Sequence, residues 1–175
     1  MKIKNSKLGF TLLELLVVVL IIGILAGIAL PQYYYVINVS KVKSNMSLVK
    51  SIVEAEQRYY LATGTYLETI NDWALGEDII GLDIDLPNIP NITYSIHSNK
   101  VLLFNRRNDI RMGYVGEDWG KVPANNFICY YYNGDNYSGT NMSVGVKEKI
   151  CKKVCNNEIQ SDFPVERHKG CIIKS

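Results

Sequence analysis

The sequence predicts an α+β protein in which one long N-terminal α-helix packs on a small antiparallel β-sheet, with disulfides in the C-terminal region. Three observations support this prediction. A helical pattern, first apolar and then amphipathic, runs from about Phe10 to Ala62. Short runs of β-forming residues follow between positions 92 and 132, and all four cysteines lie beyond position 128. The 175 residues give room for one domain of ordinary size.

Residues 1–9 form a short basic leader. They carry Lys2, Lys4 and Lys7 and no acid, and the remaining chain holds 16 basic and 17 acidic residues. A basic excess that ends with the leader leaves no electrostatic footprint for nucleic acid, so nucleic acid is not expected as a partner.

Residues 10–31 form an apolar segment that can enter a membrane. The 16 residues from Leu15 to Leu30 contain no charge. At about 1.5 Å per residue they reach only about 24 Å, less than the ~30 Å hydrocarbon core of a bilayer. Starting at Phe10 gives 21 residues, enough to span, but places Glu14 in the bilayer. An acid at that depth is costly and usually has a partner.

Two ordinary interpretations of this N-terminus are open. One is a secretory signal that is cut after the small residues Gly27-Ile28-Ala29, and the other is a plain single-span anchor. Glu14 within the apolar run argues against the signal, as does Pro31, which would lie just past the cut.

The segment Gly9-Phe10-Thr11-Leu12-Leu13-Glu14 resembles the processing site of type IV prepilins and type II secretion pseudopilins. The resemblance continues to Pro31 and covers about the first 30 to 60 residues of the chain. It implies a type IV pilin-like fold. It also implies that a prepilin peptidase, which is also an N-methyltransferase, cuts between Gly9 and Phe10 and methylates the new terminus at Phe10. In this family the acid matching Glu14 is thought to meet the N-terminal amine of a neighbouring subunit.

Small residues and a proline mark the end of the apolar segment. Gly23 and Gly27 are spaced as in membrane helices that approach one another closely. Each glycine weakens a helix by about 1 kcal/mol relative to alanine, and Pro31 lacks a backbone donor. We therefore expect residues 23–31 to be the weakest part of the helix, either kinking or only easing packing. Together with Glu14, these three residues are assigned to filament assembly.

Residues 32–63 form the amphipathic half of the helix, and residues 64–175 form the globular head. Val42, Val49 and Val53 repeat at helical spacing, and Thr63-Gly64 predicts the helix end. After a loop-like stretch come four β-type runs, which predict a meander of three or four strands: Ile92–His97, Val101–Asn105, Ile110–Val115 and Phe127–Tyr132. A second, short helical pattern covers Val146–Val154.

The even number of cysteines in an exported head predicts two disulfides among Cys129, Cys151, Cys155 and Cys171, and the three possible pairings stay open. A zinc site made of Cys151, Cys155, His168 and Cys171 is an alternative. So is a calcium site on Asp135 with Asn133 or Asn141, or on the acids between Glu77 and Asp85. The main prediction includes no metal and no cofactor. Because the sequence has no phosphate loop, HExxH or GxSxG motif, we expect no enzyme.

The sequence thus predicts a structural subunit of a type IV pilus. The lysines of the leader place it on the cytoplasmic side of a bacterial inner membrane. The mature chain would then join a periplasm-spanning or cell-surface filament. The implied partners are identical or homologous pilin subunits, the peptidase, an inner-membrane assembly platform and a separate motor ATPase.

Two alternative functions are open. One is a pseudopilin of a type II secretion system, although the C-terminal cysteines and Pro31 favour a surface pilus. The other is a minor pilin that acts as a DNA-uptake or adhesive module. The candidate surface for that role is the cationic cluster formed by Lys147, Lys149, Lys152 and Lys153.

Overall fold

The computed structural model describes residues 9–68, 81–97, 99–134, 142–156, 159, 163–164 and 167–173. The chain divides into two compact units, Met1–Ile37 and Asn38–Ser175, which are described separately below. The lysines of the leader lie outside the described residues, and so do Glu77, Asp78, Asp135 and Asn141, on which the calcium hypothesis depends.

Helix α1, Leu12–Thr63, contributes its first part to one unit and its second part to the other. Its ends agree with the predicted helix to within two residues. Pro31 lies inside the helix without ending it, and the two glycines of the apolar segment are also helical. A proline removes one backbone hydrogen bond, which weakens a long helix locally but need not break it. Gly64, with a φ of 77°, ends the helix as predicted.

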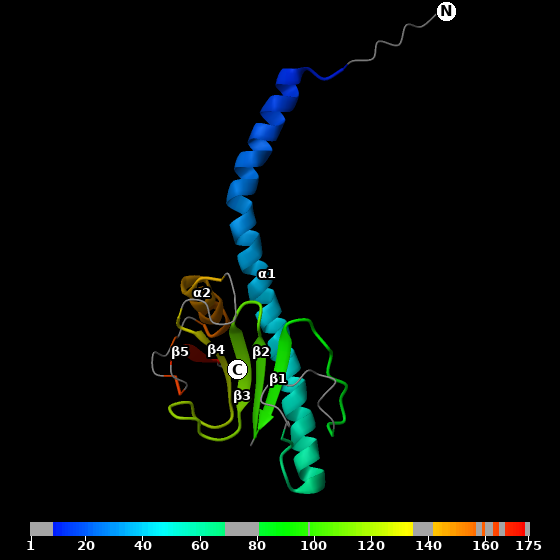
Figure 1. Ribbon diagram of the computed structural model, residues 1–175, viewed down its shortest axis with the longest axis vertical. Helices are drawn as coiled ribbons and strands as arrows, with labels where there is room; N and C mark the ends of the chain where they lie inside the picture. The colour runs from blue at the N-terminus through cyan, green and yellow to red at the C-terminus, as the bar shows by residue number, and fades with distance from the viewer. Residues whose placement is uncertain are drawn as a thin grey trace, which may run out of the picture. The chain divides into compact units, whose positions relative to one another are not determined.

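The second unit contains a five-stranded antiparallel sheet, and its strands are neighbours in the order in which they occur in the chain (Figure 1). The strands are β1, Ile92–His97; β2, Lys100–Asn105; β3, Ile110–Val115; β4, Asn126–Tyr132; and β5, His168–Ile173. The first four confirm the predicted meander with small shifts at two N-terminal ends. The fifth strand was not predicted, because its lysine and glycine are poor β-formers and its pairing with β4 is a long-range contact.

The second part of α1 packs on one face of this sheet (Figure 1). Val49, Ile52 and Val53 are buried, and the Lys50 ammonium lies 5.5 Å from the centre of the Phe127 ring in β4. A buried cluster including Tyr130 and Phe163 lies on the opposite face, because successive side chains of a strand alternate between the two faces. Both faces of the sheet are therefore covered, which accounts for the nearly continuous burial of β1 and β3.

Helix α2, Val144–Val154, lies between β4 and β5 in the chain and contacts both strands. It is two residues longer at its N-terminus than the predicted helix. Its buried residues are Lys147, Ile150 and Cys151, so a lysine stands in the row that faces the core.

Candidate processing and assembly site

The residues around the predicted cut lie in an accessible, non-helical segment. Gly9 and Phe10 precede α1, and the Phe10 side chain is 83% exposed. No atom lies within 4 Å of the place where a Cβ on Gly9 would stand. A peptidase needs an uncovered substrate segment, and Gly9 and Phe10 are both exposed.

Thr11 and Glu14 close a reciprocal pair of hydrogen bonds at the start of α1. The Thr11 N–H donates to Glu14 Oε2 at 2.7 Å, and the Thr11 hydroxyl donates to the same oxygen at 2.8 Å. The Glu14 N–H donates to Thr11 Oγ1 at 3.3 Å. This arrangement is a capping box, which satisfies backbone donors that a helix start leaves free. The Thr-x-x-Glu spacing was a sequence signal for it, and the sequence analysis assigned no role to Thr11.

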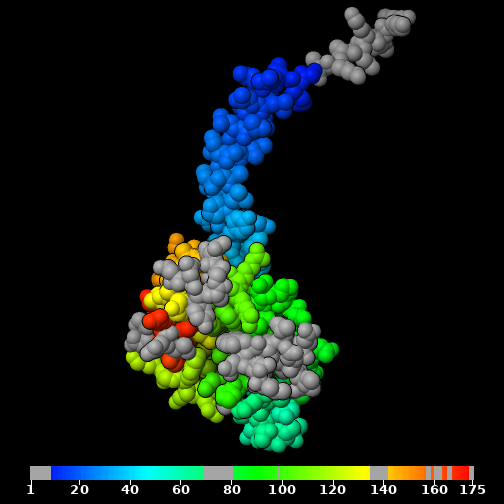
Figure 2. All heavy atoms as spheres, viewed as in Figure 1, coloured from blue at the N-terminus to red at the C-terminus, as the bar shows by residue number. Residues whose placement is uncertain are grey.

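The first part of α1 presents an apolar surface from Leu15 to Leu30. It is long and apolar enough to cross a membrane, and its most apolar window has no buried residue. The side chains of this segment, drawn in blue in Figure 2, lie at the surface of their unit. An apolar surface of this extent requires lipid or other apolar helices as a covering.

Gly23 and Gly27 lie on this apolar surface. The Cβ position of each has open space within 4 Å, so no contact inside the unit requires a glycine at either place. Pro31 lies one turn further along the same helix. Small residues on a membrane helix allow a second helix to come close, and none of the described residues approaches these two glycines in that way.

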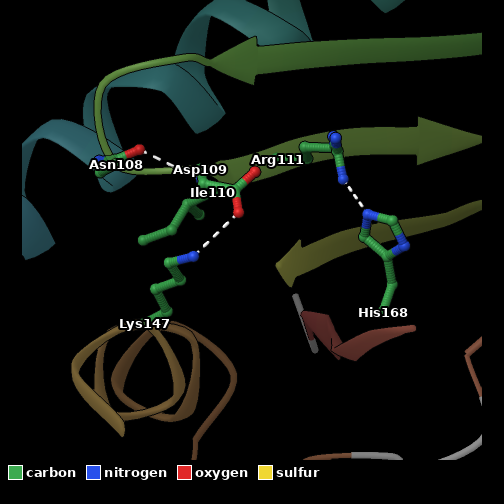
Figure 3. A network of polar contacts seen from close by, with 6 residues as sticks. All are labelled: Asn108, Asp109, Ile110, Arg111, Lys147 and His168. Atoms are coloured by element: carbon green, nitrogen blue, oxygen red, sulfur yellow. Dashed lines mark hydrogen bonds and ion pairs between the residues drawn. The ribbon is translucent and has the colours of Figure 1, made fainter. Parts of the chain in front are cut away.

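The head contains a buried ion pair that the sequence analysis missed. Lys147 Nζ lies 2.9 Å from Asp109 Oδ2, and the two side chains are 1% and 0% exposed (Figure 3). Asp109 stands in the turn between β2 and β3 with a positive φ of 54°, next to Asn108, whose side chain accepts a hydrogen bond from the Ile110 N–H. The pair joins α2 to this turn.

A second polar contact crosses the sheet. The Arg111 guanidinium on β3 contacts the His168 ring on β5 (Figure 3). Its Cζ atom also lies over two aromatic rings, 4.4 Å from the centre of Phe104 and 5.6 Å from the centre of Tyr130. These contacts hold an arginine on a largely buried face through cation–π attraction.

The structure corrects the hypothesis of a cationic cluster on the head. Lys147 is buried and paired with Asp109, and Lys152 forms an ion pair with Glu148 one turn earlier in α2. Side chains that are neutralised by acids of the same chain offer little charge to a polyanion, so the four lysines do not act as one free basic patch.

Two disulfides tie α2 to the sheet. Cys129 of β4 is bonded to Cys151, and Cys155 is bonded to Cys171 of β5, with Cα–Cα separations of 5.8 and 6.0 Å. Since a cysteine binds zinc as a thiolate, these bonds leave no cysteine free for the zinc site considered above. On the calcium alternative, Asp83 is engaged by Arg58 at 2.6 Å.

The N-terminal motif around Gly9 and Phe10 is similar to that of known proteins. The model described as the prokaryotic N-terminal methylation motif matches residues 4–30. The chain is 48% identical over 54 residues to the type IV major fimbrial protein FimA of Dichelobacter nodosus, covering 29% of this chain and 35% of that protein.

Other relatives are of the same kind. The type IV major alpha-pilin of Moraxella bovis is 46% identical over 54 residues, covering 29% of this chain and 34% of that protein. The type IV major pilin protein PilE1 of Neisseria gonorrhoeae is 40% identical over 60 residues, covering 34% and 36%. The match thus spans about a third of the length of these relatives. No solved structure matches the chain. By its methylation motif and by its similarity to these pilins over about the first third of its length, the chain resembles type IV pilins.

Proposed function

We propose that the protein is a subunit of a type IV pilus, anchored in the inner membrane as a precursor and assembled through the first part of α1. The observation that carries this proposal is the exposed apolar surface of that helix directly behind an accessible Gly9–Phe10 bond. Removal of the leader takes away its three lysines and leaves an apolar helix end that lipid or neighbouring helices can cover.

In this proposal Glu14 has one partner in the precursor and another in the assembled filament. In the precursor its carboxylate is held by the backbone and hydroxyl of Thr11. Cleavage creates an amino group on Phe10, and the family resemblance points to a pair between this acid and the amine of an adjacent subunit. A buried carboxylate is strongly unfavourable unless it is paired, so a mismatch in axial position would be penalised. The exchange of partners therefore selects one register between subunits.

Burial of apolar helix surface provides the favourable free energy of assembly in this proposal. A head-to-tail contact that does not close on itself produces a filament. Energy for extracting the precursor from the membrane would come from a separate motor ATPase acting through an inner-membrane platform, since the sequence has no nucleotide-binding motif.

A surface pilus is preferred to a secretion pseudopilus for two reasons. The relatives that the chain resembles are named as pilins and fimbrial proteins, and the head carries two disulfides in its C-terminal region. For the DNA-binding alternative, two of its four candidate lysines, Lys147 and Lys152, are paired with acids of the same chain.

The test is co-expression of the full chain with a prepilin peptidase, followed by intact mass measurement and electron microscopy. We expect loss of residues 1–9, gain of one methyl group, and filaments in cells that carry the assembly machinery. Glu14→Ala should be cut but should not form filaments, and the exposed Glu54→Ala should behave as wild type. A cut after Ala29 would contradict the proposal. Loss of protein export without surface filaments would indicate a pseudopilin.

A further inference from the structure

Glu56 is a carboxylic acid on the face of α1 that packs on the sheet. Its side chain is 2% exposed, and the residues one turn before it, Ile52 and Val53, are buried apolar side chains. Its Oε1 atom is buried and makes no hydrogen bond. A buried polar atom without a partner is uncommon and destabilising. The head is therefore less stable with a glutamate at this position than it would be with a leucine.

Among the described residues, two phenols lie near Glu56. Tyr114 of β3 and Tyr66, which follows the end of α1, are near enough for its charge to act on them. Burial raises the pKa of the Tyr114 phenol, and the nearby Tyr66 and Glu56 raise it further. Burial likewise raises the pKa of the Tyr66 phenol, and Tyr60, Glu56 and Glu117 add to the effect. Each of these groups is neutral or acidic.

The two cations of α1 that are nearest to Glu56 in the sequence are engaged elsewhere. Lys50 lies over the Phe127 ring of β4, and Arg58 is bound through two nitrogens to the Asp83 carboxylate at 2.6 and 2.8 Å. Burial without a compensating cation disfavours the ionised form of a carboxyl group. It raises the pKa of Glu56 from 4.5 to about 7.

We propose that Glu56 is a proton-operated latch between the second part of α1 and the sheet. With its proton, the carboxyl group is neutral and the interface stays closed. Loss of the proton places an unpaired negative charge between Ile52, Val53 and the sheet, and the interface then opens more often. The inference rests on the fold of the head alone and is independent of the proposed role in a pilus.

The direction of the pH dependence follows from linkage. Because the pKa is higher in the closed state, the neutral carboxyl contributes its full stability below about pH 4.5. That contribution is lost as the pH rises to about 7, and it stays lost above that pH. Over this window the open fraction increases by up to about tenfold per pH unit.

The experiment is hydrogen exchange of the full chain in detergent micelles, read by mass spectrometry between pH 5 and pH 8. The variant is Glu56→Gln, which keeps the shape but cannot ionise, and the control is Glu54→Gln, an exposed acid two residues away on the same helix. Comparison of variants at equal pH removes the intrinsic pH dependence of exchange.

We expect peptides that cover residues 49–59 to exchange about tenfold or more faster in wild type than in Glu56→Gln at pH 8, with a clearly smaller difference at pH 5. Glu54→Gln should follow wild type at every pH. Equal rates for wild type and Glu56→Gln across the range would overturn the proposal. So would a difference of the same size at both ends, since a purely structural role is independent of pH.

A second measurement protects the test if Glu56→Gln folds poorly. The carboxyl carbon of Glu56, followed by isotope-edited NMR in the wild-type chain, should titrate well above the range of the exposed glutamates. Titration near pH 4.5 would refute the latch. Glu56→Met, which replaces the acid with an apolar side chain of similar volume, should reproduce the flat exchange profile of Glu56→Gln.

Discussion

The ion pair between Asp109 and Lys147 joins the β2–β3 turn to α2 inside the core of the head, with 2.9 Å between Lys147 Nζ and Asp109 Oδ2. The second carboxylate oxygen of Asp109 is buried and makes no hydrogen bond. Removal of one partner from a buried pair leaves an uncompensated charge, which is more harmful than replacement of both partners.

Lys147→Met alone should therefore lower the free energy of unfolding of the head by about 3–5 kcal/mol. The double change Lys147→Met with Asp109→Asn should recover much of that loss, since no charge is then left unpaired. Urea unfolding followed by tyrosine fluorescence measures both. Lys153→Met, on the exposed side of α2, is the control and should be near neutral. A loss below 1 kcal/mol for Lys147→Met would show that the pair contributes little.

The capping box predicts a local effect at the start of α1. Thr11→Ala removes the hydroxyl that holds Glu14, and loss of such a cap typically costs about 1 kcal/mol. We expect amides in the first turn of α1 to exchange about fivefold faster in micelles, which corresponds to that free energy. Thr11→Ser keeps the hydroxyl and should remain close to wild type. Equal exchange in Thr11→Ala and wild type would mean that the box is not formed in a lipid environment.

The two disulfides make a prediction that needs no variant. Digestion without reduction should release one peptide pair linked through Cys129 and Cys151, and another linked through Cys155 and Cys171. Any other pairing contradicts the arrangement described here. Replacement of either pair by alanines should lower the free energy of unfolding by about 3 kcal/mol, because each bond restricts the unfolded chain.

Two glycines offer a matched test of packing. A Cβ on Gly113 would stand 2.5 Å from a Leu102 methyl and 2.8 Å from the Val101 carbonyl oxygen, so Gly113→Ala should cost about 1–3 kcal/mol. Gly145, near the start of α2, has open space at the same position. Gly145→Ala should be neutral or stabilising by up to about 1 kcal/mol. The measurement is the melting temperature of each variant in thermal unfolding. Similar values for Gly113→Ala and Gly145→Ala would count against the close β2–β3 contact.

Much of the architecture was predictable because its signals are local. The apolar run, the amphipathic repeat through Val49 and Val53, and Gly64 define α1 in the order of the chain. Alternation and turn residues define four strands. The strand β5 has no such signal, since Lys169 and Gly170 are poor β-formers and the strand exists through its pairing with β4.

The partners of buried charged residues are also difficult to predict from the sequence. Lys147 looked like one of several surface lysines, because its partner Asp109 lies 38 positions away in the chain. Glu56 was closer to being detected, since it follows Ile52 and Val53 at helical spacing and so falls in the apolar row. The Thr11-x-x-Glu14 spacing of the capping box was also visible in the sequence. The prediction assigned Glu14 to assembly and did not include the capping box.

The order of the strands in the sheet also has a consequence for the folding pathway of the head. From β1 to β4, each strand pairs with the one synthesised just before it, so these contacts form between segments that are close in the chain. The pairing of β4 with β5 spans the whole α2 region and is the long-range step. Since contacts distant in sequence form slowly, the first four strands should assemble early. The Cys155–Cys171 disulfide should secure the last strand at the end of folding.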